Sequence, residues 1–242
     1  MMRTLIVGDP VVHLGDEPLI ADGAIVVEDG KVADVGARAR LESGTFDETL
    51  GGPGYFVMPG FVNCHYHSEC ALVPGVYDLI FERANIRIHG SLFALAEDDL
   101  YHAILANLLL LIRGGQTAAI DMYYGRPGME LFGAEPALRA YRDAGMRVAF
   151  GLVTRDQNTY VDDDDEAFRS CLPARLADEL HALPIGYAWP ADDVLAATRR
   201  LAARWDGHDQ RIRIIAAPDW TPACSDSLYR ATAGSPTSWR PA

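Results

Sequence analysis

The feature that most constrains the fold is an alternation that begins near Phe61 and continues through most of the remaining chain. Short apolar runs, each long enough for one strand, are separated by segments long enough for a helix. Two parallel strands need a crossover of a dozen or more residues between them, and this crossover is usually helical. The alternation therefore predicts an α/β fold in which helices cover a parallel sheet. The predicted strands lie near Phe61, Ile120, Val148 and Ile214.

Local helix signals support this interpretation. Residues 97–112 carry apolar side chains at helical spacing behind an acidic start, and two glycines follow them. Residues 135–144 and 192–205 show the same periodicity, and Gly145 follows the first of these segments. An acidic run at residues 162–166 opens a further helical stretch, where negative charge stabilises a helix amino terminus. We interpret this run as a solvated cap, because it lacks the ligand spacing of a calcium-binding loop.

The number of βα units falls short of a closed barrel. A (β/α)8 TIM-type barrel takes about 250 residues, which is more than residues 58–242 provide. We therefore predict a partial barrel of about four βα units, equivalent to the amino-terminal half of a TIM-type fold. Residues 234–242 are rich in Gly, Ser and Pro and show no periodicity. Two interpretations of this segment stay open, an interrupted barrel and a disordered natural tail.

Residues 1–57 differ from the rest of the chain in their pattern of apolar and polar residues and are predicted to form a separate β segment. Residues 23–36 are two β-rich runs joined at Asp29-Gly30, which is a strong hairpin signal. We expect a small antiparallel sheet that belongs to a composite β-sandwich domain. The predicted boundary with the barrel portion lies between residues 57 and 58.

The charge balance narrows the classes of partner. The chain has 21 basic and 34 acidic residues and a formal net charge of −13, which disfavours nucleic acid and anionic membranes as partners. The first residues lack the apolar core of a signal peptide, and the longest apolar stretch, residues 103–112, is too short to cross a membrane. The four cysteines form no C-x-x-C pair, which is typical of reduced thiols. We expect a cytoplasmic protein without a nucleic-acid or membrane partner.

The candidate functional residues are two histidines on the first predicted barrel strand. Side chains along a strand alternate between its faces, so His65 and His67 project to one side together with Asn63. Two imidazoles placed in this way can share one divalent metal ion. They also lie at the carboxyl end of the strand, where barrel enzymes collect their catalytic groups. The alternative is a pair of hydrogen-bonded structural histidines.

The sequence around this pair is Val-Met-Pro-Gly-Phe-Val-Asn-Cys-His-Tyr-His, at residues 57–67, and it follows an amino-terminal β segment. In this arrangement the chain resembles the metal-dependent amidohydrolase superfamily, in particular its cytosine-deaminase-like aminohydrolases and triazine chlorohydrolases. The resemblance continues in order along the chain. Residues 111–122, 145–148, 214–218 and 224–226 are similar to the second, third and fourth strand regions of that branch and to the helix start that follows.

The resemblance implies both a chemistry and an incomplete set of ligands. One divalent ion, most readily zinc and otherwise iron, would be held by His65 and His67 and would activate water. The reaction would be hydrolysis of a carbon–nitrogen or carbon–halogen bond in a small nitrogen heterocycle or amide. The family adds histidines from its fifth and sixth strands and an aspartate from its eighth. These three ligands have no counterpart here, since no histidine follows His208 and the aspartates Asp219 and Asp226 belong to the fourth-strand region.

Two acidic residues are expected near the histidines. Glu69 would share the face of His67 if the strand continued, and it could then contact substrate; its alternative role is that of a loop carboxylate. Asp121, at the end of the second strand, could accept a hydrogen bond from a metal-bound histidine. A structural role in the turn is the alternative for Asp121.

A half barrel with two metal ligands has predictable limits. We expect the chain alone to bind zinc weakly and to show little or no deaminase activity. Its open sheet edges and apolar interior face favour association, with a second copy or with a complementary chain. The alternative to an enzyme is a non-catalytic fragment that binds metal or a partner chain without turnover.

Overall fold

The chain folds into two compact units with separate sheets and separate cores. The computed structural model describes residues 2–13, 19–72, 95–125, 129–157, 164–182 and 190–233. Contacts divide the chain into the units Met1–Gly60 and Phe61–Ala242. No helix within the described ranges combines the length and apolar character that crossing a lipid bilayer requires.

Two of the sequence predictions fall wholly or partly outside the described residues. The segment 234–242 lies outside them, as do the first two residues of the acidic run 162–166. Within that run, Asp164 accepts a hydrogen bond from the Ala167 amide at 2.7 Å and caps the helix that follows. This is the solvated-cap role predicted for the run.

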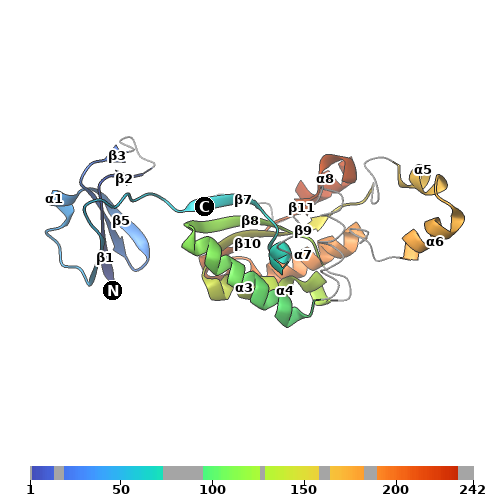
Figure 1. Cartoon of the computed structure of the whole chain (residues 1–242), viewed down its shortest axis with the longest axis horizontal. Coiled ribbons are helices and arrows are strands. Elements are labelled where there is room, and N and C mark those ends of the chain that lie inside the picture. The colour runs from blue at the N-terminus through green and yellow to red at the C-terminus, as the bar shows by residue number, and fades with distance from the viewer. Residues whose placement is uncertain are drawn as a thin grey trace. The chain divides into compact units, whose positions relative to one another are not determined.

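The first unit is a four-stranded sheet in the order β5-β4-β1-β6, and β2 pairs with β3 in a separate short ribbon (Figure 1). Its elements are β1 (Arg3–Gly8), β2 (Val11–Val12), β3 (Leu19–Ile20), β4 (Gly23–Glu28), β5 (Lys31–Ala37), α1 (Arg38–Leu41) and β6 (Glu48–Gly51). β4 and β5 form the predicted hairpin. Asp29 and Gly30 at its turn have φ of 48° and 79°, as the two central residues of a tight hairpin turn require. The buried core of this unit consists of Leu5, Val7, Ala24, Val26 and Leu41.

One pairing in this unit departs from the expected antiparallel arrangement. β6 runs parallel to β1, so the sheet is mixed. The chain reaches β6 through α1 and a loop rather than a tight turn, and this longer connection lets it return in the direction of β1. All four residues of β6 are exposed, so no alternation of apolar and polar residues marks the strand in the sequence.

The second unit is a parallel sheet in the order β10-β9-β8-β7, with β11 also parallel to β9. Its strands are β7 (Phe61–Tyr66), β8 (Gln116–Tyr123), β9 (Arg147–Thr154), β10 (Ile212–Ile214) and β11 (Ala217–Pro218). Its α-helices are α3 (Glu97–Arg113), α4 (Ala134–Ala144), α5 (Asp165–Ser170), α6 (Ala174–Ala182), α7 (Ala191–Trp205) and α8 (Asp226–Ala233). Short 3-10 turns are η1 (Ser68–Leu72), η2 (Glu130–Gly133), η3 (His208–Gln210) and η4 (Thr221–Ala223). The predicted partial TIM-type barrel is thus confirmed, with the fourth strand divided into β10 and β11.

Helices α3, α4 and α7 lie along one face of the parallel sheet (Figure 1), and together with the strands they enclose the main core. At its centre Phe150 of β9 is fully buried, with ring centroids 5.2 Å from Tyr123 and 6.4 Å from Tyr141. Gly145 ends α4 in the left-handed region, with φ of 72°, which is a common helix terminator. These helices cover the outer face of the half barrel.

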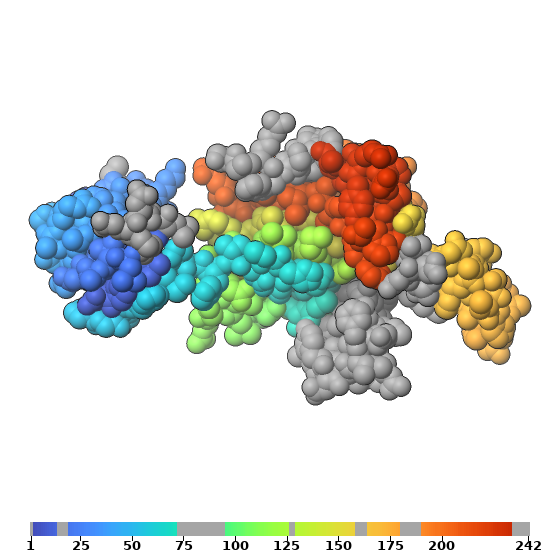
Figure 2. All heavy atoms as spheres, turned by 90° about the horizontal axis from the view of Figure 1, so that it is seen from above, coloured from blue at the N-terminus to red at the C-terminus, as the bar shows by residue number. Residues whose placement is uncertain are grey.

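The sheet of the second unit has two edges, β7 and β10, within the described part of the chain. A closed barrel has no edges, because every strand pairs on both sides. On β7, Phe61 is 55% exposed and Val62 is 59% exposed. Figure 2 shows the atoms of this strand, in cyan, at the surface of the unit. The strand that carries the candidate histidines is therefore an edge strand in the described residues.

Candidate functional site

The parallel strands of the second unit deliver their carboxyl ends to one side of the sheet. β7, β8 and β9 are neighbours, and β11 is parallel to β9, so the residues that follow them lie close together. In parallel α/β folds this is the side on which ligands bind. The candidate site is built at the ends of these four strands.

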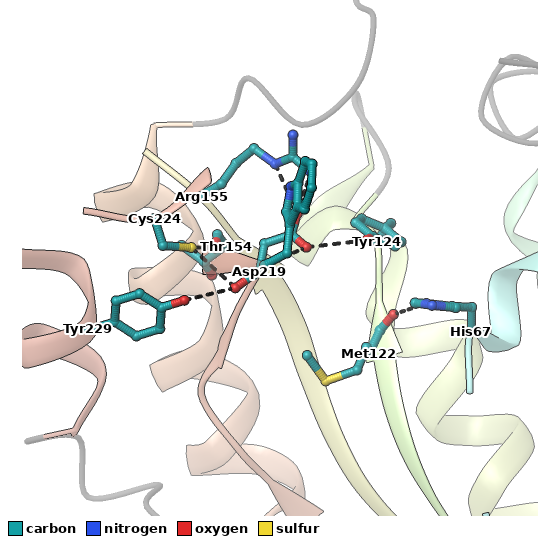
Figure 3. Close-up of polar contacts among 9 residues, drawn as sticks. His67, Met122, Tyr124, Thr154, Arg155, Asp219, Cys224 and Tyr229 are labelled. Atoms are coloured by element: carbon teal, nitrogen blue, oxygen red, sulfur yellow. Dashed lines mark hydrogen bonds and ion pairs between the residues drawn. The ribbon is translucent and has the colours of Figure 1, made fainter. Parts of the chain in front are cut away.

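The structure brings His65 and His67 together. Their Nε2 atoms are 3.0 Å apart, and their rings meet edge to face with centroids 4.7 Å apart. The Nδ1 atom of His67 lies 2.6 Å from the carbonyl oxygen of Met122 on β8 (Figure 3). A carbonyl can only accept, so we assign the proton of His67 to Nδ1. The lone pair on Nε2 is then directed toward His65.

This donor pair has the chemistry and spacing of a divalent-ion site. Imidazole nitrogens bind zinc at about 2.1 Å, so two of them on one ion lie about 3 to 4 Å apart. Burial lowers the pKa of His67, while its contact with the Met122 carbonyl acts in the opposite direction. The ring is thereby kept neutral near pH 7, in the form that binds metal. Within the described ranges, no three or more His, Cys, Asp or Glu side chains are grouped to hold an ion.

Asp121 is fully buried on β8, and its predicted contact with a metal-bound histidine stays a prediction. Its Oδ1 accepts from the Ser68 amide at 3.1 Å, and its Oδ2 accepts from the Tyr141 hydroxyl at 3.0 Å. The acceptor for His67 is the carbonyl of Met122. Burial raises the pKa of Asp121 to about 6, while the hydrogen bonds from Ser68 and Tyr141 act in the opposite direction. Asp121 therefore anchors the turn that follows the histidine strand.

Glu69 lies in η1, because β7 ends at Tyr66 and strand alternation does not reach it. Its side chain is 1% exposed, and its Oε1 accepts from the Tyr124 amide at 3.2 Å. Its Oε2 has no hydrogen-bond partner among the described residues. Burial raises the pKa of this carboxyl well above its usual value, and the nearby Asp121 adds to the rise. Contact between Glu69 and substrate stays a prediction.

Three further residues lie at the strand ends and were not predicted as site residues from the sequence, namely Tyr124, Arg155 and Asp219. The Tyr124 ring stacks on His67, with centroids 5.2 Å apart and an interplanar angle of 25°. Arg155 and Asp219 form an ion pair whose side chains are 9% and 10% exposed. Figure 3 shows the three side chains at the ends of neighbouring strands. Each residue directly follows an observed strand, β8, β9 or β11, and a position just beyond a predicted strand is the signal that could have identified them.

A model of the amidohydrolase family matches residues 56–234. The chain is similar to a 5-methylthioadenosine/S-adenosylhomocysteine deaminase from Desulforamulus reducens, with 27% identity over 230 residues, covering 93% of this chain and 44% of that protein. It is also similar to a 5'-deoxyadenosine deaminase from Methanothermobacter thermautotrophicus, with 27% identity over 233 residues, covering 95% of this chain and 45% of that protein.

A solved structure gives the same correspondence at the level of the fold. The chain is similar to an atrazine chlorohydrolase from Arthrobacter aurescens TC1 complexed with zinc, with a TM-score of 0.71 and 20% identity. This match covers 95% of this chain and 49% of the other. The chain thus spans about half the length of the relatives it matches.

Proposed function

The chain belongs to the amidohydrolase family, and from this premise we propose that it forms the metal-holding half of a deaminase site. The reaction would be hydrolysis of a carbon–nitrogen bond on a nitrogen heterocycle. Water would supply the oxygen that replaces the amino group, and ammonia would leave. The observation that carries the proposal is the approach of His65 Nε2 to His67 Nε2, at 3.0 Å, at the carboxyl end of β7.

His65 and His67 would hold one divalent ion, with zinc favoured and iron as the alternative. When bound, such an ion lowers the pKa of water, so that attack on a ring carbon becomes accessible near neutral pH. The chain's own contribution is orientation. The Met122 carbonyl fixes the tautomer of His67, as outer hydrogen bonds do in many metal sites.

The turn behind the histidines is held by buried carboxyls. Asp121 accepts from the Ser68 amide, and Glu69 accepts from the Tyr124 amide. These two bonds join η1 to β8 and its end, so the segment that follows His67 is tied to the neighbouring strand. Among the described residues we assign no group to proton transfer, and the proposed role is restricted to the metal-holding part of the site.

The relatives indicate which substrate class to test first. One is named as a 5-methylthioadenosine/S-adenosylhomocysteine deaminase and another as a 5'-deoxyadenosine deaminase, so an aminopurine nucleoside is the favoured class. A chlorinated triazine is the second, because a structural relative is named as an atrazine chlorohydrolase. A non-catalytic metal-binding role is a second candidate function, and the observation that favours it is the pair of histidines without a third grouped ligand in the described residues.

Zinc titration tests the proposal directly. Zinc affinity would be measured by competition with a chromophoric chelator for the unaltered chain, His65→Ala, His67→Ala and His102→Ala. His102 is an exposed helix histidine whose Nδ1 contacts the Asp98 carbonyl, so it serves as the matched control. We expect weak binding of one ion, lost in the first two variants and kept in the third. Equal affinity in all four proteins would contradict the proposal.

A parallel assay addresses the chemistry. Ammonium release from 5'-deoxyadenosine and chloride release from atrazine would be followed with and without added zinc. We expect very low turnover from the chain alone, because two protein ligands are fewer than the three that catalytic zinc sites use. Any turnover should require zinc and disappear in His65→Ala. Zinc-independent release that survives His65→Ala and His67→Ala would refute the proposed site.

A further inference from the structure

We propose that Asp219 is a positioning residue for His67, and that it acts by holding the Tyr124 ring against the His67 imidazole. This inference rests on the proposed function, in which His67 is a metal ligand. It concerns a residue that directly follows β11, in the fourth strand region, whereas His67 directly follows β7, the first strand. The connection between them is made by side chains, across three strands.

The backbone of Asp219 is fixed on both sides. Its N–H donates to the Thr154 carbonyl at 2.9 Å. Its own carbonyl accepts from the Tyr229 hydroxyl at 3.2 Å and from the Cys224 thiol at 3.5 Å. These contacts join Asp219 to the end of β9 and to α8 (Figure 3). The position of the Asp219 side chain is therefore set by the strand ends rather than by a free loop.

The carboxylate of Asp219 is fully engaged by four donors. Oδ2 accepts from Arg155 Nε at 2.9 Å and also from Arg155 Nη2. Oδ1 accepts from the Trp220 amide at 2.9 Å and from the Tyr124 hydroxyl at 3.5 Å. A carboxylate has about four lone-pair positions, so this arrangement leaves none for an ion or a substrate. Asp219 is consequently placed to orient its donors and not to bind a ligand itself.

Tyr124 contacts both Asp219 and His67, so the fixed position of Asp219 restricts the position of His67. Its hydroxyl contacts Asp219 and its ring stacks on the imidazole of His67, at 5.2 Å between centroids and 25° between planes. The Met122 carbonyl holds Nδ1 of the same imidazole, but a single hydrogen bond still allows the ring to rotate about that contact. The stacked Tyr124 ring restricts this rotation. The direction of Nε2, which faces His65, then depends on both contacts.

The positive charge of Arg155 helps to hold the Asp219 carboxylate in place. The Arg155–Asp219 pair is largely buried, and an ion pair between buried groups is screened less by salt than an exposed one. Both of its hydrogen bonds end on one oxygen of Asp219, Oδ2, while the Trp220 amide holds the other, Oδ1. The Tyr124 hydroxyl therefore meets an acceptor whose orientation is already fixed.

The test uses two variants that keep the shape of the cluster. Asp219→Asn removes the charge and alters the pairing with Arg155, and Tyr124→Phe removes only the hydroxyl while keeping the ring. The first readout is the nuclear magnetic resonance signature of the His67 ring in the metal-free, 15N-labelled chain, assigned by its loss in His67→Ala. We expect the ring proton resonances of His67 to move in both variants, because the ring current of Tyr124 acts on them in the stacked arrangement.

The second readout is zinc affinity, measured by chelator competition. We expect both variants to bind zinc about tenfold more weakly, at the lower end of the range for changes in outer-shell partners of metal ligands. The matched control is Glu135→Gln. Glu135 accepts from the Trp205 indole at 2.9 Å and pairs with Arg204 at 2.9 Å, so this variant also perturbs a charged contact but leaves the strand ends intact. It should change neither readout.

The outcomes separate this inference from the proposed function. If Tyr124→Phe and Asp219→Asn match the unaltered chain in both readouts while His67→Ala abolishes zinc binding, the positioning role is refuted. If Glu135→Gln weakens zinc binding as much as Asp219→Asn does, the effect is general destabilisation and the role is also refuted. If His67→Ala leaves zinc affinity unchanged, the proposed function fails. The shifts of the His67 resonances then still decide whether Asp219 orders the ring.

Discussion

Replacement of Asp121 by asparagine should remove a pH dependence from the stability of the chain. Asp121 is fully buried, and its burial raises the carboxyl pKa from the usual 3.8 to about 6. At 1.36 kcal/mol for each unit of pKa, this rise corresponds to about 3 kcal/mol. The sign of the pH dependence follows from the fact that the pKa is raised. The native state holds the proton more tightly than the unfolded state, so its stabilising effect is complete below about pH 4 and is lost as the pH rises through 6.

The assay compares two proteins across this pH range. The free energy of unfolding in urea would be measured between pH 4 and pH 7.5, with a chelator present, for the unaltered chain and for Asp121→Asn. Asparagine does not titrate, so the variant should lose less stability between pH 4 and pH 7.5 than the unaltered chain, by about 2 kcal/mol, because part of the full effect lies below pH 4.

The carboxyl of Asp143 serves as a control, because its pKa is shifted in the opposite direction. The hydrogen bond with Arg142 is the main cause that lowers the pKa of Asp143, and the Tyr101 hydroxyl adds to it. Asp143→Asn should therefore reduce stability above the usual aspartate pKa and change little below it. The prediction is refuted if the unfolding free energies of Asp121→Asn and the unaltered chain differ by the same amount at pH 4 and pH 7.5. It is also refuted if the variant loses more stability than the unaltered chain as the pH rises, which is the direction expected for Asp143→Asn.

Three further outcomes follow from the structure. Phe150→Ala removes a fully buried ring between Tyr123 and Tyr141 and should cost about 3–5 kcal/mol in the free energy of unfolding, measured in urea; a cost below about 1 kcal/mol would contradict the assigned core. Gly30→Ala places a Cβ in open space but at a φ of 79°, so it should destabilise the first unit by about 1–2 kcal/mol through backbone strain alone; a neutral change in thermal unfolding would speak against the turn. Zinc should dialyse out of the chain, because the described residues group two ligands; stoichiometric zinc after dialysis, lost in His65→Ala, would show a stronger site.

The second unit was predictable because its signals are local. Apolar runs of strand length alternate with segments of helix length. Because parallel strands need such long, usually helical connections, this alternation predicts a parallel sheet. The approach of His65 to His67 follows from the same period of two along β7. By contrast, β6 was not predictable as a parallel neighbour of β1, since its residues are all exposed and carry no alternation.

The rest of the candidate site depends on contacts that sequence spacing does not encode. Tyr124 and Asp219 meet across strands that are far apart in the chain, and only the sheet order brings them together. The acceptor for His67 is a backbone carbonyl, that of Met122, and every residue has such a group. Glu69 was placed on the face of His67 on the condition that the strand continued, whereas β7 ends at Tyr66 and a tight turn buries the carboxyl.

The position of β7 at an edge has a kinetic consequence. Its backbone pairs with β8, and on its other side it meets no strand of the described part of the chain. An outer strand held along one flank frays more readily than an inner one, so its amide protons should exchange with solvent sooner than those of β8 or β9. An ion that bridged His65 and His67 would link the end of this strand to the residue beyond it and would slow the fraying of that end.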